Sequence, residues 1–346
     1  MPERAPHPIV ELTLARFREF LREPEAVFWV FAFPVLMALA LGIAFRGETP
    51  APIPVGVIVG QGHDTTIAAL AEDAGLAPRA LEASEVEAAL RNGTVHAVVV
   101  PGAPPVYRYD PSRPESRLAR LTVDAALQRA AGRVDGVGAR DERVVTPGSR
   151  YIDWLLPGLL GMNIMGTGLW SIGFHVVQAR SRKLLKRLMA TPMRRTDFLL
   201  SLVLARLLFL ALEVVALLGF GWLAFRVPVH GSLVELGFVA LFGSLAFGGL
   251  GLLIASRART IEGVSGLMNV AMLPMWVLSG VFFASDNFPD AMQPFIRALP
   301  LTALNEALRG VMIDGASLPA LWLRLAVLGV WGGGCYVVAV RVFRWR

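Results

Sequence analysis

Six long apolar stretches alternate with polar segments along this chain, and a much longer polar segment separates the first stretch from the other five. Each stretch comes close to the roughly 20 residues that an α-helix needs to cross a hydrocarbon core of ~30 Å. The pattern predicts an α-helical integral membrane protein with six transmembrane helices in a one-plus-five layout, at residues 27–45, 154–177, 198–225, 233–255, 261–283 and 320–343.

The first apolar stretch is predicted to remain in the mature protein. A cleaved signal peptide has a short apolar core followed by small residues at the cleavage site. Here the stretch is long and ends at Arg46 without such a site. The composition agrees with a membrane protein, because 55% of the 346 residues are hydrophobic and only 17% are charged.

Lysine and arginine are concentrated in alternate connections, which predicts the orientation in the membrane. They gather before the first stretch, between the second and third, between the fourth and fifth, and after the sixth, whereas the short loop between the third and fourth holds only Arg226. Since short cytoplasmic loops retain Lys and Arg, we expect a multi-pass protein of the cell membrane with both termini in the cytoplasm. The net charge of +6 then reflects topology rather than nucleic-acid binding, for which no motif appears.

The polar segment 46–150 is predicted to form a small α/β domain, inserted after the first helix and extracytoplasmic in this orientation. β-branched runs predict strands at 53–60, 95–100 and 106–109, and helical patterns predict helices at 65–74, 84–91 and 117–131. Ser84 and Glu87 form a capping box at the start of the second helix. The third helix has apolar residues spaced for a buried face, namely Leu118, Leu121, Ala125 and Leu127. A docking or gating role suits such a domain.

No residue pattern in this chain predicts a catalytic, metal or cofactor site. Gly60 and Gly62 follow a predicted strand, but the third glycine of a dinucleotide-binding turn is absent at Thr65. The five histidines are scattered, and Cys335 is the single cysteine. We therefore expect no catalytic residue, no metal and no cofactor within the chain.

Two amphipathic segments are predicted on the cytoplasmic side. In the lead, residues 1–26, a helix over 9–23 has one apolar stripe and can lie in the membrane interface or pack on a soluble partner; the stripe is Val10, Leu14, Phe17 and Leu21. In the connection 178–197, a short helix with basic residues around an apolar face precedes Thr191 and Pro192, which fit an N-cap followed by proline. That apolar face consists of Leu184, Leu185, Leu188 and Met189.

At this connection the sequence resembles the permease subunits of type-2 ABC exporters. In that family a cytoplasmic coupling helix joins the second and third spans and ends in Leu-x-x-Thr-Pro followed by a basic residue, matched here by Leu188, Thr191, Pro192 and Arg195. A second block matches after the fifth span, with residues 278–283, Pro289, residues 300–302 and Arg309. The insert resembles the extracytoplasmic domain of the longer family members.

The resemblance implies a function and a set of partners. It implies an exporter permease that forms a dimer with a second copy or a related permease, and that moves lipids, amphipathic drugs or conjugates. It also implies a separate ABC ATP-binding subunit that binds ATP and Mg²⁺. The implied contacts with that subunit are Arg182, Leu184, Leu185, Leu188, Thr191, Pro192 and Arg195. Residues 151–346 would form the five-helix transmembrane domain, with an extracytoplasmic re-entrant or interfacial segment at 285–319.

Arg206 and Glu213 are ionisable residues inside the third predicted span. Such groups are costly at bilayer depth and normally face the bundle or a wet cavity. Their seven-residue spacing puts them on one face of the helix, although too far apart for a direct pair. Glu213 then has either a transport or gating role or a structural partner such as Asn163 or Asn269. Candidates for translocation or gating are Arg206, Glu213, Phe282, Phe283, Pro300 and Thr302.

The sequence favours a transport subunit over an enzyme. It contains no Gly-x-x-x-x-Gly-Lys followed by Ser or Thr, the loop that cradles nucleotide phosphates. Two alternatives remain at this point. One is a proton-coupled secondary transporter that uses Glu213, and the other is a non-transporting membrane sensor or scaffold built around the extracytoplasmic domain.

Overall fold

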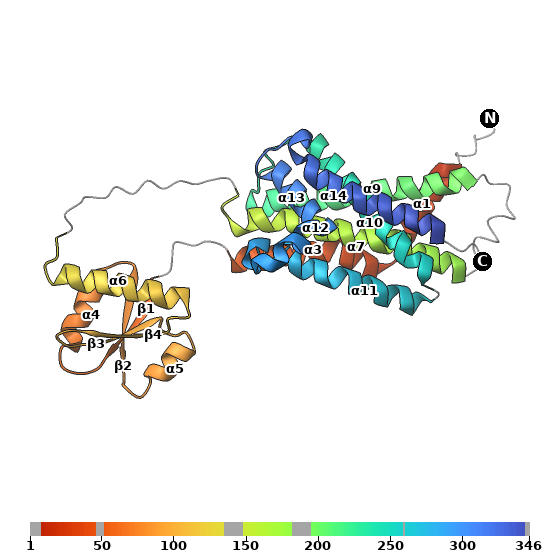
Figure 1. Cartoon of the computed structure of the whole chain (residues 1–346). Helices are drawn as coiled ribbons and strands as arrows, with labels where there is room; N and C mark the ends of the chain where they lie inside the picture. Colours follow the sequence, from red (N-terminus) through yellow and green to blue (C-terminus); the bar gives the residue numbers. More distant parts are fainter. Residues whose placement is uncertain (1–7, 46–51, 135–147, 182–194, 259, 343–346) are drawn as a thin grey trace. The chain divides into compact units, whose positions relative to one another are not determined.

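The computed structural model describes residues 8–45, 52–134, 148–181, 195–258 and 260–342. The chain divides into two compact units (Figure 1). One combines Met1–Arg46 with Val145–Arg346, and the other is Gly47–Val144. Each unit has its own hydrophobic core, so the chain is a helical unit interrupted by an inserted α/β unit.

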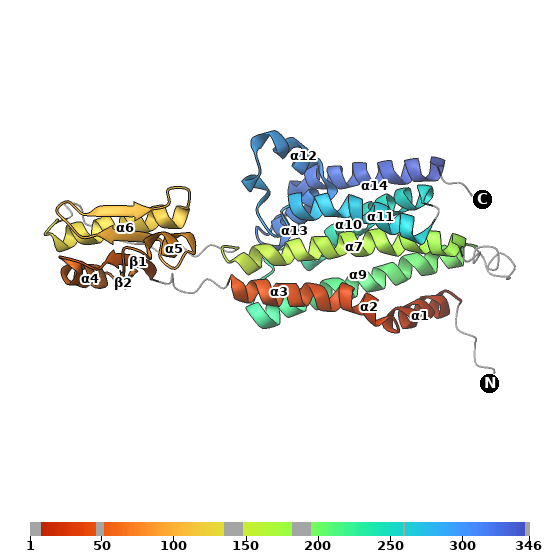
Figure 2. The same ribbon diagram turned by 90° about the horizontal axis from the view of Figure 1, so that it is seen from below.

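The helical unit contains six helices, among the described residues, that are long and apolar enough to cross a membrane. They lie side by side along a common direction (Figures 1 and 2). The first consists of α2 (Pro24–Val27), a π-helical turn (Phe28–Ala32) and α3 (Phe33–Ala44). The others are α7 (Tyr151–Ser181), α9 (Arg195–Phe225), α10 (Leu233–Arg257), α11 (Ile261–Leu278) and α14 (Trp322–Val342). The one-plus-five layout predicted from the sequence is confirmed.

Small residues bring α7 and α10 into close contact. A Cβ atom on Gly251 of α10 would lie 2.6 Å from the carbonyl oxygen of Leu169 in α7. A Cβ atom on Gly173 of α7 would lie 2.9 Å from the carbonyl oxygen of Gly251. Close backbone approach of this kind is typical of packed helices in membranes, and α7 and α10 form the centre of the bundle.

The fifth span ends earlier than predicted. We expected it to reach residue 283, but α11 ends at Leu278, and Gly280 follows with a φ of +68°. Glycine adopts this left-handed conformation without the steric cost of a Cβ atom. The chain then forms two short 3₁₀ turns, at Ser285–Asn287 and at Asp290–Met292, which are followed by the helices α12 (Gln293–Ala298) and α13 (Pro300–Met312).

Helix α13 is enclosed by other helices. Nearly all of its residues are buried, and it packs against α7, α10 and α14. Helix α13 is therefore part of the bundle core. An interfacial helix would instead leave one side exposed. Entry of this segment into the bilayer from the extracytoplasmic side stays a prediction.

The lead forms α1 (Pro8–Leu21) and packs on α9. The ring centroids of Phe17 and Phe20 lie 5.6 Å and 4.5 Å from that of Phe209 in α9. Leu14 and Leu21 are exposed. The predicted apolar stripe is therefore only partly correct, because the packed face includes Phe20 and excludes these two leucines.

The inserted unit is a four-stranded sheet in the order β2-β1-β3-β4. The pairs β1–β2 and β1–β3 are parallel, and β3–β4 is antiparallel. Helices α4 and α6 cover one face and α5 lies on the other. The bounds are β1 Ile53–Ile58, α4 His63–Ala71, β2 Leu76–Leu81, α5 Val86–Arg91, β3 Ala97–Val100, β4 Val106–Tyr109 and α6 Pro114–Ala130. The small α/β domain predicted from the sequence is confirmed.

Two local predictions in this unit are wrong, and a third is only partly correct. Strand β2 was missed because it contains Pro78 and few β-branched residues, and proline is tolerated there since β2 is an edge strand. The capping box is absent, because the N-cap of α5 is Glu85 and makes no side-chain cap. The buried face of α6 is formed by Ser116, Ala119, Val123 and Ala126. Of the residues predicted for it, Leu127 packs against the core, whereas Leu118 and Leu121 are each 57% exposed. The small side chains let α6 lie close to the sheet.

Candidate functional site

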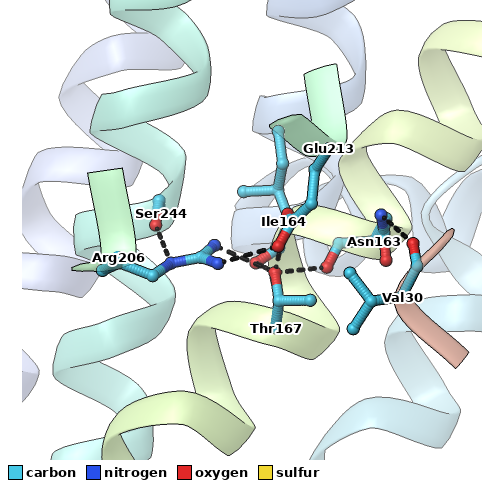
Figure 3. A network of polar contacts seen from close by, with 7 residues as sticks. All are labelled: Val30, Asn163, Ile164, Thr167, Arg206, Glu213 and Ser244. Carbon is cyan, nitrogen blue, oxygen red and sulfur yellow. Dashed lines mark hydrogen bonds and ion pairs between the residues drawn. The ribbon is translucent and has the colours of Figure 1, made fainter. Parts of the chain in front are cut away.

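A buried ion pair lies in the middle of the helical unit. Arg206 Nη1 is 3.0 Å from Glu213 Oε1, and both residues belong to α9 (Figure 3). The side chain of Glu213 is 1% exposed and that of Arg206 is 14% exposed. The expectation that these residues are too far apart for a direct pair is wrong. Helical side chains point toward the N-terminus of their helix, so the Glu213 side chain extends back toward Arg206. The long arginine side chain spans the remaining distance along α9.

Two neighbouring helices complete the hydrogen bonding of the arginine. Nη2 of Arg206 donates to Thr167 Oγ1 of α7 over 2.9 Å, and Nε donates to Ser244 Oγ of α10 over 2.9 Å (Figure 3). Each nitrogen of the guanidinium therefore has an acceptor, which is the condition for burying a charged group at tolerable cost. The pair thereby links α9 to α7 and α10.

Thr167 connects the carboxylate to the same network. Its hydroxyl accepts from Arg206 and has a single hydrogen of its own. That hydrogen can go to Glu213 Oε2, 3.0 Å away, or to the carbonyl oxygen of Asn163, 2.8 Å away. Both carboxylate oxygens of Glu213 thus have a polar neighbour. The structural partners of Glu213 are Arg206 and Thr167, not Asn163 or Asn269.

Asn163 extends the polar contacts to the first span. Its Nδ2 donates to the carbonyl oxygen of Val30 over 3.0 Å (Figure 3). In an α-helix that oxygen would accept from residue 34, but Pro34 has no N–H group. The backbone around it forms the π-helical turn Phe28–Ala32. Asn163 therefore supplies this carbonyl with a donor where Pro34 has no N–H group to offer.

The arrangement is a polar cross-link between helices in which the charges of Arg206 and Glu213 balance. Glu213 has a cation and a hydroxyl beside it, and these contacts link α9 to α7. In the part of the chain that the structure describes, no group of three or more His, Cys, Asp or Glu is placed to hold a metal ion. Thr167 and Ser244 were not among the site residues predicted from the sequence. Their polar side chains within spans were the available signal.

The other predicted site residues divide into two groups. The proposed ATPase contacts Arg182, Leu184, Leu185, Leu188, Thr191 and Pro192 lie outside the described residues. Arg195 is the first residue of α9. Of the gating candidates, Phe282 and Phe283 lie in the turn after α11, and Pro300 and Thr302 are buried in the first turn of α13. The structure does not bring these four residues to the Arg206–Glu213 pair.

Comparison with known proteins identifies the family. The model of the ABC-2 type transporter family matches residues 121–313, which is more than half of the 346 residues and includes α7, α9, α10, α11 and α13. The chain belongs to the ABC-2 type transporter family. The resemblance to type-2 ABC permeases is thus confirmed, and the buried pair lies within the matched region of this family member.

Several curated proteins are similar to this ABC-2 family chain over part of its length. The probable multidrug ABC transporter permease YbhR of Escherichia coli is 24% identical over 197 residues, which are 56% of this chain and 53% of YbhR. ABC transporter G family member 20 of Dictyostelium discoideum is 26% identical over 189 residues, which are 54% of this chain and 26% of that protein. The chain therefore spans about half of the first relative and about a quarter of the second.

Proposed function

We propose that this chain is the permease subunit of an ATP-driven ABC exporter and forms the translocation path for a hydrophobic or amphipathic substrate such as a lipid, drug or conjugate. The observation that carries the proposal is the bundle of six apolar spans whose matched region belongs to the ABC-2 family. The name of YbhR, a probable multidrug permease, supports the substrate class. A dimer with a second copy or a related permease is part of the proposal.

The energy source is proposed to be a separate subunit. The sequence has no phosphate-binding loop, and we infer that an ABC ATP-binding subunit binds ATP and Mg²⁺. A proton-coupled mechanism through Glu213 is less well supported, because both oxygens of its carboxylate already have polar partners. Co-purification with a co-expressed ATP-binding subunit, followed by ATPase assays with a panel of lipids and amphipathic drugs, tests the proposal. A chain that binds no such subunit and transports in response to a proton gradient would refute it.

Replacing Leu184 and Leu188 with Asp should release the ATP-binding subunit. The proposed coupling segment has an apolar face with these two leucines, and a carboxylate on that face would be buried without a counter-ion. We expect the co-purified ATPase to be lost while the permease remains inserted. The matched control replaces Leu118 and Leu121, which are exposed on α6, with Asp. Full ATPase binding by the first variant, or its loss in the control as well, would contradict this assignment.

The inserted α/β unit is proposed to be extracytoplasmic, as the distribution of basic residues indicates. Cysteines introduced at Ser84 and Ser112, both exposed, should react with an impermeant maleimide in intact cells. Ser116 would be a poor position, because it is 2% exposed, and the native Cys335 is buried. A cysteine introduced at Arg257, predicted to be cytoplasmic, serves as the control. Labelling of positions 84 and 112 only after the membrane is broken would show that the inserted unit is cytoplasmic and would contradict the proposal.

A further inference from the structure

The turn between α11 and the first 3₁₀ turn, residues 279–284, is called here the α11 turn. Three of its carbonyl oxygens accept hydrogen bonds from side chains of other helices. Ser279 O accepts from Asn305 Nδ2 over 2.9 Å, and Gly280 O accepts from Arg309 Nη2. Phe282 O accepts from the Tyr151 hydroxyl over 3.1 Å. Asn305 and Arg309 belong to α13 and Tyr151 to α7, so two helices hold the turn.

The carbonyl of Val281, between two of these residues, lies against α7. A Cβ atom on Gly158 would lie 2.8 Å from Val281 O, so only glycine permits the observed approach. One turn further along α7, a Cβ atom on Gly161 would lie 2.0 Å from Asn305 Oδ1. The amide oxygen of Asn305 therefore faces the backbone of α7, a geometry typical of Cα–H···O contacts between helices. Asn305 touches α7 with one end of its amide and the α11 turn with the other.

Among the described residues Arg309 makes no salt bridge, and its guanidinium is held by a backbone carbonyl and an aromatic ring instead. Its Nε donates to Trp154 O over 3.2 Å, and its guanidinium carbon lies 3.9 Å from the centre of the Trp154 ring. The neighbouring Glu306 is 3.1 Å from Arg324. The guanidinium also lies at the C-terminal end of α11, where the helix dipole favours a cation. Helix α13 thus caps α11 from outside that helix.

The held turn presents an exposed aromatic residue. Val281 is fully buried, whereas Phe283, two residues later, is 65% exposed. A backbone fixed at residues 279–282 leaves the following residue little freedom of direction. The exposed ring of Phe283 is therefore attached to a backbone that hydrogen bonds hold in place.

We propose that Asn305, Arg309 and Tyr151 are positioning residues that fix the α11 turn, so that Phe283 moves with α7 and α13 as one body instead of swinging on a loop. This inference rests on the proposed exporter function, in which Phe282 and Phe283 are candidates for gating. It predicts that α13 sets the orientation of the α11 turn and of Phe283. A transport step that shifts α13 would therefore shift Phe283 as well.

Local mobility of the α11 turn tests the inference. A nitroxide label is placed on a cysteine at the exposed Ala284 in the full chain with Cys335→Ala, reconstituted in lipid nanodiscs. We expect a single slow spectral component in this parent. Tyr151→Phe and Arg309→Lys should each add a fast component on the nanosecond timescale. Ser279→Ala is the matched control, because it removes a buried hydroxyl that has no hydrogen-bond partner and keeps the carbonyl.

A second label separates local release from general loosening. A cysteine at Ser317, which is exposed and follows α13, should give the same spectrum in the parent and in both variants. A fast component already present in the parent, unchanged spectra in Tyr151→Phe, or an equal change at Ser317 would overturn the inference. If Arg309→Lys does not fold, the spectrum of Tyr151→Phe alone tests the inference. Failure to bind an ATP-binding subunit would instead count against the exporter proposal, and would leave the mobility result intact.

Discussion

Replacing Arg206 with Met should destabilise the helical unit strongly, because it leaves the buried Glu213 carboxylate without its cation. Glu213 is 1% exposed and its Oε1 lies 3.0 Å from Arg206 Nη1. Removal of one partner of a buried pair costs about 3–5 kcal/mol. We expect a loss of this order in the free energy of unfolding, measured by denaturant titration of the reconstituted protein, together with a lower yield of inserted chain.

Two further variants show whether the loss of stability comes from the unpaired charge, and whether the carboxylate also acts in transport. The double variant Arg206→Met with Glu213→Leu removes both charges, so it should recover most of the stability. Glu213→Gln keeps the shape and removes the charge. The polar cross-link predicts lower thermal stability with normal turnover per folded molecule for this variant. A normal melting temperature with reduced transport would show instead that the carboxylate acts in the transport cycle. If Arg206→Met is as stable as the wild type, the pair does not hold the bundle.

Gly161→Ala should also destabilise the bundle, through a steric conflict. The new Cβ atom would lie 2.0 Å from Asn305 Oδ1, and Asn305 is fully buried with its amide nitrogen bonded to Ser279 O. Neither the side chain nor α7 can move away freely. Overpacking of this kind costs about 1–3 kcal/mol, and we expect a drop in the unfolding free energy within that range.

Gly166→Ala, in the same helix, is the matched control. Its new Cβ atom would meet only Met272 Cε at 3.8 Å, an ordinary contact. Alanine favours a helix over glycine by about 1 kcal/mol, so stability should stay equal or rise. Equal losses in both variants would mean that the helix itself, and not the contact with Asn305, responds to the substitution.

The candidate site could be found from the sequence but not assembled from it. Charged residues are rare in apolar spans, and this rarity identified Arg206 and Glu213 directly. Their mutual contact depends on side-chain length and direction, which residue spacing alone does not describe. Thr167 and Ser244 lie on other helices, so their contacts with Arg206 depend on how α7 and α10 rotate against α9. Helix rotation is a property of packing.

The α/β unit shows the same limit on a smaller scale. Periodicity located α6, but Leu118 and Leu121 are exposed on it while Ala119 and Val123 are buried. Helix α6 carries apolar residues on more than one face, and the face buried against the sheet has mostly small side chains. Strand β2 has weak strand propensity and forms because β1 offers it a full set of backbone partners.

The sequence by itself determined the class of protein, the six spans and the one-plus-five order, because crossing a bilayer requires a length and an apolarity that can be read residue by residue. It also determined the family, through short motifs at set positions in that order. Only the tertiary structure decided which residues meet: the pairing of Arg206 with Glu213, the contact of Asn163 with the π-helical turn, and the capping of α11 by Asn305 and Arg309 of α13. These contacts join segments distant in the chain, and they depend on close approach at glycines such as Gly158 and Gly161, whose role is visible only once the facing helix is in place.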